Sequence, residues 1–322
     1  MLSVEYYMKK AEDLIIYKDV PVSYGIKQMP INGGTMKNDG IELNLSTTLL
    51  RMKDFVWNIS LNTSKNRNRI KSTLLPNNSW LAAVSGDLNK AGYPVSAFWA
   101  FELQGLDPQN GTPVFNIPTK NNNEEGIGVN DATEYMKYMG KMEPDFTGGL
   151  SMSIRYRNLS LSGGFTLSLG GKRFLHSLFQ SKNFPYSLPS AYDNYSKDFV
   201  NRWKKSGDEK STNIPSIPSV GTGNVNISFP GGNLVSNVYE MFDYSDARVV
   251  DASFFRCNNL TLTYNLPQNL VKYMTLKAVS ISGSVSNPFM IVSKDYKGVD
   301  PEVATGGQPL ARNYSVRLNI TF

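Results

Sequence analysis

The sequence predicts an all-β fold, in which about eight antiparallel strands form a portion of a larger transmembrane β-barrel with long extracellular loops and short periplasmic turns. Three observations support this prediction. Apolar and polar residues alternate with a period of two in many segments, and this is the period of strands rather than helices. Short and long connections between these segments follow one another in turn. The final strand ends on an aromatic residue, Phe322.

The N-terminal half of the chain contains four of the predicted strands, at about residues 1–7, 38–50, 54–65 and 147–157. In the last three of these, one face is apolar and the other carries mainly Ser, Thr, Asn or charged residues. Such one-sided strands are typical of outer-membrane barrels, which present one face to lipid and the other to a polar lumen. The apolar faces consist of Ile41, Leu43, Leu45, Thr47 and Leu49, then Phe55, Trp57, Ile59 and Leu61, and then Leu150, Met152, Ile154 and Tyr156.

The C-terminal half supplies the other four strands, at about residues 158–170, 251–266, 275–286 and 312–322. The last strand has the clearest pattern, because it alternates without interruption and places Arg317 on its polar face. We expect Arg317 to face the lumen, since arginine on the lipid side of a barrel is unfavourable. A final strand that ends in Phe also resembles the signal read by the barrel-assembly machinery. The predicted lipid-facing residues are Tyr314, Val316, Leu318 and Ile320, with Phe322 at the inner rim.

The connections alternate in length as they do in outer-membrane barrels, where periplasmic turns are short and extracellular loops are long. The four long connections are 8–37, 66–146, 171–250 and 287–311, and the short ones are Arg51–Lys53, Arg157–Asn158 and Pro267–Thr275. Structureless connections of about eighty residues would be unusual in a compact water-soluble domain. We therefore expect the long connections to lie outside the membrane.

Composition is compatible with this fold and excludes several function classes. The hydrophobic content is 40% and the mean hydropathy is −0.31, as expected when only one face of each strand meets lipid. Cys257 is the single cysteine, so no intrachain disulfide can form. The formal charge of +6 comes from scattered residues, apart from one basic cluster at Lys65–Lys71. This cluster suits a rim that meets charged glycans or lipopolysaccharide better than it suits nucleic acid, which we do not expect as a partner.

The sequence contains no convincing catalytic, cofactor or metal site. His176 is the single histidine, and its neighbour Ser177 would point to the opposite face of a strand, so we interpret His176 as a structural or loop residue. Asp295, Asp300 and Glu302 lack the spacing of a calcium-binding loop, and Asp300 precedes a proline as in ordinary turns. We therefore predict that the chain is not an enzyme and has no cofactor.

Aromatic residues in the long connections are the candidate ligand contacts. Flat rings with polar edges suit stacking on sugars or gripping peptides. The alternative is that they pack the loops against one another, and we expect packing for any single ring. Residues 193–203 place three aromatic side chains four residues apart, which predicts a short amphipathic helix. The candidate ligand-binding residues are Trp80, Tyr93, Trp99, Tyr192 and Trp203.

Several ordered motifs resemble the SusC/RagA class of TonB-dependent outer-membrane transporters. They include Asn32–Leu43, Gly92–Gly111, Pro144–Gly149, Asp251–Pro267 and Tyr296–Val303, followed by the terminal strand. Ala100, Cys257 and Thr263 depart from the residues expected of this class, and these departures affect packing only. The resemblance covers nearly the whole chain and aligns it with the C-terminal part of the barrel. It implies an active importer of glycans or peptides in the outer membrane of a Gram-negative bacterium.

The resemblance also implies partners, namely a SusD-like surface lipoprotein and the TonB complex. Met1–Tyr7 shows no signal-peptide pattern, and no plug domain or TonB box is present. We therefore expect residues 1–322 to be the C-terminal section of a longer barrel, with TonB contacted by a missing N-terminal region. Two alternatives remain from the residues alone: a soluble β-sandwich that binds a ligand, and a complete small barrel with an anchoring or adhesive role.

Overall fold

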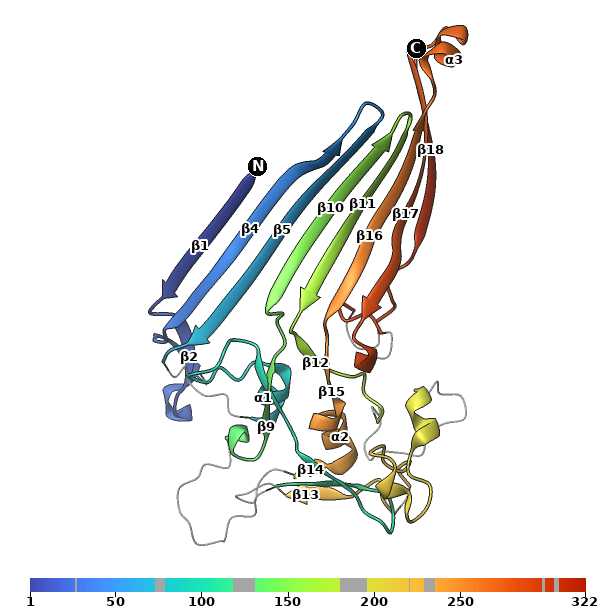
Figure 1. Cartoon of the computed structure of the whole chain (residues 1–322). Helices are drawn as coiled ribbons and strands as arrows, with labels where there is room; N and C mark the ends of the chain where they lie inside the picture. The colour runs from blue at the N-terminus through green and yellow to red at the C-terminus, as the bar shows by residue number, and fades with distance from the viewer. Residues whose placement is uncertain are drawn as a thin grey trace.

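A computed structural model of the chain describes residues 1–26, 28–72, 79–117, 131–179, 196–219, 221–228, 235–296, 299–303 and 307–322. One eight-stranded antiparallel sheet dominates it, and strands that follow one another in the sheet also follow one another in the sequence (Figure 1). We call the end from which the long connections emerge the loop end, and the opposite end the turn end. The strands, in sheet order, are β1 (Leu2–Ala11), β4 (Met36–Arg51), β5 (Phe55–Ile70), β10 (Phe146–Tyr156), β11 (Leu159–Leu169), β16 (Phe254–Asn265), β17 (Ala278–Val292) and β18 (Asn313–Thr321).

The predicted fold class is therefore confirmed, and all eight predicted strands are present. Three strands, β1, β5 and β17, extend several residues further toward the loop end than predicted. The basic residues at the end of β5 stay paired with β4 as far as Met36–Ile70. Residues 287–289, predicted to start a loop, lie within β17, which bulges there: residues 287 and 288 stand opposite the single β16 residue Asn258, and Asn287 adopts a positive φ of 51°. A local bulge thus accommodates Pro288 without ending the strand.

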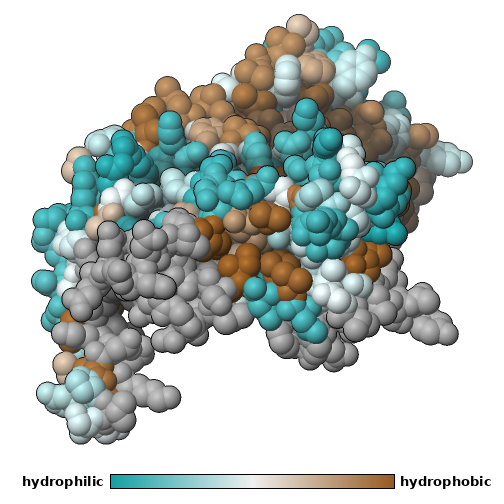
Figure 2. All heavy atoms as spheres, turned by 90° about the horizontal axis from the view of Figure 1, so that it is seen from below, coloured by the Kyte–Doolittle hydropathy of each residue, from teal (hydrophilic) through white to brown (hydrophobic). Residues whose placement is uncertain are grey.

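The pairing register separates the sheet into an apolar and a polar face. Leu61 pairs with Leu45 on one side and with Leu150 on the other. Leu150 in turn pairs with Phe165, so one apolar row crosses four strands. Because side chains alternate between faces, the neighbouring positions form polar rows on the opposite face. Viewed from the loop end, brown hydrophobic residues gather along the upper margin and a band of teal hydrophilic residues lies below them (Figure 2).

Glycines allow close approach at two places on the sheet. The ring of Tyr7 on β1 covers Gly40, its partner on β4, at a distance that a Cβ atom would not allow, and the Tyr7 hydroxyl donates a hydrogen bond to Asn66 Oδ1 (3.0 Å). The second place is Gly163-Gly164, where the pairing of β11 with β16 shifts between Gly164 and Phe165. A Cβ at Gly164 would lie only 2.7 Å from Asn259 Oδ1.

The connections at the turn end are short, as predicted, except that the one between β16 and β17 contains a helix, α3 (Gln268–Tyr273). The long connections fold into short elements of their own. The strand pairs are β2 (Ile15–Asp19)–β3 (Gln28–Asn32), β6 (Ala97–Ala100)–β9 (Lys137–Lys141), β7 (Leu103–Leu106)–β8 (Pro113–Phe115), β12 (Lys172–Phe174)–β15 (Val249–Asp251) and β13 (Asn226–Ser228)–β14 (Val235–Asn237). The helices are α1 (Trp80–Ser85) and α2 (Val238–Asp243). The 3-10 turns are Val22–Tyr24, Ala132–Glu134, Lys197–Asn201, Asp208–Lys210, Asp246–Arg248 and Lys294–Tyr296.

The main hydrophobic core lies in these connections and not on the sheet. Two segments far apart in sequence, 66–146 and 171–250, build it together around the aromatic residues of β6 and α2. Trp99, Phe101, Tyr239 and Phe242 are its largest buried side chains. The predicted helix at 193–203 is instead a 3-10 turn, Lys197–Asn201, and the start of that segment lies outside the described residues.

β1 and β18 form the two edges of the sheet, and each has one neighbouring strand in the described part of the chain. The sheet does not close on itself, which argues against the alternative of a complete eight-stranded barrel. Sequential strands are neighbours throughout a single sheet, which argues against a two-layered sandwich. Among the described helices, none has the length and apolar character needed to cross a membrane.

Candidate functional site

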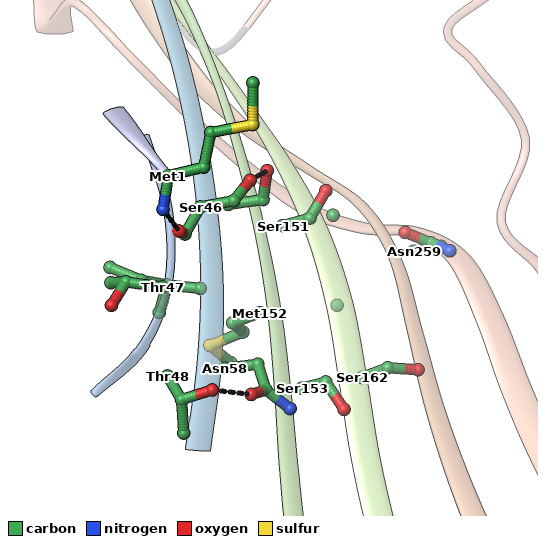
Figure 3. A pocket seen from close by; sticks show the side chains of 14 residues that line it. Met1, Ser46, Thr47, Thr48, Asn58, Ser151, Met152, Ser153, Ser162 and Asn259 are labelled. Atoms are coloured by element: carbon green, nitrogen blue, oxygen red, sulfur yellow. Dashed lines mark hydrogen bonds between the residues drawn. The ribbon is translucent and has the colours of Figure 1, made fainter. Parts of the chain in front are cut away.

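An open pocket of about 810 Å³ lies on the polar face of the sheet (Figure 3). Hydroxyl and amide side chains supply most of its lining, and no acidic or basic side chain takes part. The sequence determines this composition, because strand residues on one face are Ser, Thr or Asn at successive alternate positions. The lining residues are Met1, Ser46, Thr47, Thr48, Asn58, Ile59, Ser60, Ser151, Met152, Ser153, Ser162, Gly163, Gly164 and Asn259. Four of them, Thr47, Ile59, Met152 and Gly163, form a row that the register assigns to the apolar face.

Two neighbouring polar rows form the centre of this wall. Within them, the hydroxyls of Ser46 and Ser60 are 2.8 Å apart, and the Thr48 hydroxyl donates to Asn58 Oδ1 at 2.8 Å. These hydroxyl and amide groups use part of their hydrogen-bonding capacity on each other, and the rest can donate to or accept from a ligand. The first row is Ser46, Ser60, Ser151, Gly164 and Asn259, and the second is Thr48, Asn58, Ser153, Ser162 and Thr261.

Charged residues occupy the polar face on either side of these two rows. Glu42 lies nearer the loop end, and its β1 partner is Glu5. Arg155 and Arg317 share one row nearer the turn end, linked through the pairing of β11, β16 and β17. Arg317 therefore lies on the polar face, as its sequence position predicts. The wall is neutral in the middle and charged toward both ends.

At the loop end, Arg256 connects the sheet to the connection between β17 and β18. Its guanidinium contacts Asp300 Oδ1 at 2.6 Å and Glu302 Oε2 at 2.8 Å. Arg256 and Asp300 are both buried. Two of the three carboxylates considered for calcium therefore bind an arginine, and no cluster of potential metal ligands is found within the described residues. This contact holds the chain near Asp300 against the polar face of β16.

The predicted ring contacts differ widely in exposure. Trp99 is 2% exposed and belongs to the loop core, so its ring offers no open face for stacking. Tyr93 packs against Trp99 (ring centroids 5.2 Å apart) and Trp80 packs against Phe101 (5.7 Å), and both remain partly exposed. Trp203, also partly exposed, lies on the backbone of Gly111 and its indole N–H donates to Glu209 (3.3 Å). Tyr192 lies outside the described residues.

The predicted lipid-facing residues of β18 share one face of the strand and are all exposed. Leu318 pairs with Ile281, and Ile320 pairs with Val279, so they extend the apolar rows of the interior strands. Phe322 follows the last paired residue. The register supports these assignments, whereas contact with lipid and a role in assembly stay predictions.

Sequence reasoning did not identify Asp243, at the end of α2, as a structural residue. Its carboxylate accepts hydrogen bonds from the backbone N–H groups of Leu178 (2.6 Å) and Phe179 (2.9 Å). Burial raises the pKa of Asp243 to about 6, although these two hydrogen bonds and the nearby Arg248 act in the opposite direction. No local sequence signal marks this role, because the donors lie more than sixty residues away. The carbonyl oxygen of His176 accepts a hydrogen bond from Arg248, which fits a structural position for that residue.

Comparisons with known proteins agree with a transmembrane-barrel portion. No family model matches the chain. TonB-dependent receptor SusC of Bacteroides thetaiotaomicron is 28% identical over 341 residues, covering 99% of this chain and 30% of that protein. TonB-dependent receptor P3 of Formosa agariphila is 24% identical over 352 residues, covering 100% and 32%. A structure of the RagAB peptide transporter superposes with a TM-score of 0.72 at 22% identity, covering 100% of this chain and 33% of that one.

The fold and the polar wall thus define a portion of an antiparallel transmembrane β-barrel. Over its whole length the chain is similar in sequence to TonB-dependent receptors that include SusC, which confirms the resemblance predicted from its motifs. The likeness to RagAB, at this identity, establishes the fold. The chain spans about a third of the length of the curated relatives that it matches.

Proposed function

We propose that this chain forms part of the wall of an outer-membrane importer, and that the substrate is a neutral, hydroxyl-rich oligomer such as a glycan. The neutral middle of the polar face is the observation that carries this proposal. Hydroxyl and amide groups can exchange hydrogen bonds with sugar hydroxyls as they pass, without holding an ion tightly. A substrate with fixed charges would meet no compensating charge in the two central rows. RagAB is a peptide transporter, so peptides are the second candidate substrate.

The partners follow from the same proposal. A SusD-like lipoprotein would cover the loop end, where two long connections share one core. Energy coupling through TonB would use regions beyond these 322 residues, and the barrel-assembly machinery would read the end of β18 at Phe322. Among the rings predicted to contact a ligand, the partly exposed Trp80, Tyr93 and Trp203 remain candidates. We expect no catalytic step, because import needs only passage along the wall.

Uptake measurements with the full-length receptor test the proposal. In a strain that depends on this receptor, neutral oligosaccharides and uncharged and charged peptides are supplied separately, and uptake is compared with a deletion strain. We expect deletion to abolish oligosaccharide uptake. Ser151→Glu, which places a negative charge in the neutral rows, should reduce oligosaccharide uptake several-fold while the receptor still assembles. The matched control Ser206→Glu adds the same charge at an exposed loop position and should leave uptake unchanged.

The possible results separate the parts of the proposal. Loss of peptide uptake alone would show an importer with the other substrate class. Unchanged uptake of every compound after deletion would overturn the importer. Equal uptake by the Ser151→Glu and Ser206→Glu variants would show that the pocket wall does not contact the substrate.

A further inference from the structure

A second groove, of about 520 Å³, lies between the loop end of β5 and the segments that follow β9 and β11. It forms because β5 continues beyond Phe146, the first residue of β10, as far as Ile70, so that residues 66–69 of β5 have no strand partner on the β10 side in the described part of the chain. Ile70, at the end of β5, exchanges backbone hydrogen bonds there with Gly92 and Tyr93. Figure 1 shows β5 ending near the strand and helix segments of the loop end. The groove is therefore a break between adjacent strands and not part of the central wall.

Cationic side chains line both sides of this groove. Lys65, Arg67 and Arg69 come from β5, and Lys141 and Lys172 come from the opposite side. The stem of Lys172 lies against Gly140, with its Cδ 3.4 Å from where a Cβ would be, which directs it along the groove. Asp145 is the one carboxylate in the lining, and it is already paired with Lys141 (2.8 Å).

The other four cations have no ion-pair partner among the described residues. Asp39 is the cross-strand neighbour of Arg67, but its carboxylate contacts Lys37 instead (3.6 Å). Three of these four cations, on β5, are exposed and lie within a few residues of one another. Like charges held this close repel each other unless an anion lies between them. The groove thus has the charge of an anion-binding site.

The face of the sheet identifies the source of that anion. Lys65, Arg67 and Arg69 continue the alternation of Ile59 and Leu61, so they lie on the apolar face and not on the polar wall. They follow directly after the last apolar positions of that face in the direction of the loop end. In a barrel, this level is where hydrocarbon gives way to the headgroups of the outer leaflet. A substrate passing through the lumen would not meet these side chains.

We infer that this groove binds the phosphate groups of a phosphorylated glycolipid in the surrounding outer leaflet. The inference rests on the membrane placement in the proposed function, but it concerns a different face of the sheet. Arginine binds phosphate oxygens through two parallel N–H groups, and lysine adds a point charge. Arg67 and Arg69 would each contact a phosphate group, with Lys65 and Lys172 on either side. The bound glycolipid would fill the break between β5 and β10.

The full-length receptor, purified in a zwitterionic detergent, tests the inference with lipid A as the probe. Native mass spectrometry counts the lipid A molecules retained by the wild type and by the K65Q/R67Q/R69Q variant. The matched control K204Q/K205Q/K210Q removes three exposed cations from another loop. We expect the groove variant to retain at least about tenfold less lipid A, and the control to stay within about twofold of the wild type. Dephosphorylated lipid A should bind as poorly to the wild type as lipid A binds to the groove variant.

Other outcomes would overturn the inference. Equal retention by the groove variant, or equal binding of the dephosphorylated lipid, would show that phosphate recognition lies elsewhere. Binding of a sulfated oligosaccharide or of inorganic phosphate without lipid A would indicate a site for free anions. If the triple variant does not assemble, Arg67→Gln compared with Arg67→Lys gives the same test with one side chain. If the groove variant loses lipid A binding while oligosaccharide uptake stays normal, the inference holds separately from the proposed function. If the groove variant keeps lipid A binding while oligosaccharide uptake is lost, the groove is not the lipid A site.

Discussion

The sheet and the connections at its loop end place their apolar side chains in opposite ways. On interior strands of the sheet, Leu262 and Ile281 are 49% and 44% exposed. In the connections, Trp99 and Tyr239 are 2% and 0% exposed. One chain therefore follows two rules of burial, because its two regions meet different solvents. The sheet satisfies its backbone by pairing and leaves its side chains for lipid, whereas the connections need a core because water surrounds them.

The same contrast explains why the sheet shows a regular apolar–polar pattern in the sequence and the connections do not. A strand that separates lipid from a polar wall must alternate, and any slip of one residue would exchange the two faces. A core built from segments 66–146 and 171–250 needs no such period, since its contacts join distant parts of the chain. The predictions below test whether the two regions respond to substitution independently.

The largest expected effect is on the connections. Trp99→Ala removes a fully packed ring from the loop core, and truncation of a buried aromatic residue costs about 3–5 kcal/mol. We expect faster cleavage of the loops by protease on intact cells, while heat-modifiable migration shows an unchanged barrel. Val200→Ala, at an exposed position of the same region, is the control and should change cleavage little. Loss of the barrel together with the loops would show that the two regions fold as one unit.

The second effect concerns the sheet. Leu318→Arg places a charge on the lipid face of β18, which costs about 2–4 kcal/mol at mid-depth, and should block assembly into the membrane. Arg317→Leu, one residue earlier on the polar face, should be tolerated. The amount of heat-modifiable receptor in outer-membrane fractions measures both variants. The opposite result, with Leu318→Arg assembled and Arg317→Leu not, would invert the assignment of the two faces.

The third effect is the pH dependence of the loop core. Burial raises the pKa of Asp243 from 3.8 to about 6. The folded core thus holds this proton more tightly than the unfolded chain does. The resulting stability is present below about pH 4 and is lost as the pH rises through 6, by up to about 3 kcal/mol. The melting temperature followed by tryptophan fluorescence should fall over this range.

The control variants for this pH effect keep a hydrogen-bond acceptor at each position. Asp243→Asn keeps one acceptor oxygen for Leu178 or Phe179, but its NH2 group cannot accept from the other, so the variant should be less stable at every pH. It has no proton to lose, so its melting temperature should vary less between pH 4 and 6. Asp208→Asn, in a half-buried turn where Oδ2 accepts from the backbone N–H groups of Lys204 and Lys205, should keep the wild-type dependence. An unchanged pH dependence in Asp243→Asn would assign the effect to another group.

The sheet could be predicted from the sequence because its rules are local. Alternation and connection length located all eight strands, and Arg317 fixed the polar face of the last one. β17 continues past Pro288 because it bulges against β16 at residues 287 and 288, and this break in the strict alternation of β17 resembles the end of a strand. The roles of Asp243, Arg256 and Trp99 depend on partners far away in sequence. The rings were recognised as a group, but their individual exposure follows from packing between two long connections.

The smallest effect is expected at the turn end. Arg157 Nε lies 3.4 Å from Asp54 Oδ2, and both side chains are largely exposed. An exposed ion pair of this kind contributes about 0.2–1 kcal/mol, so Arg157→Gln should reduce barrel stability by no more than that in a urea titration. The Arg157 backbone N–H still donates to the Asp54 carbonyl oxygen (2.7 Å), so the two turns remain joined. Arg157→Gly should cost even less, because Arg157 has a positive φ of 52° that glycine adopts without strain. A loss well above about 1 kcal/mol would mean that this turn, and not the two-faced pattern of the strands, sets the register of β10 and β11.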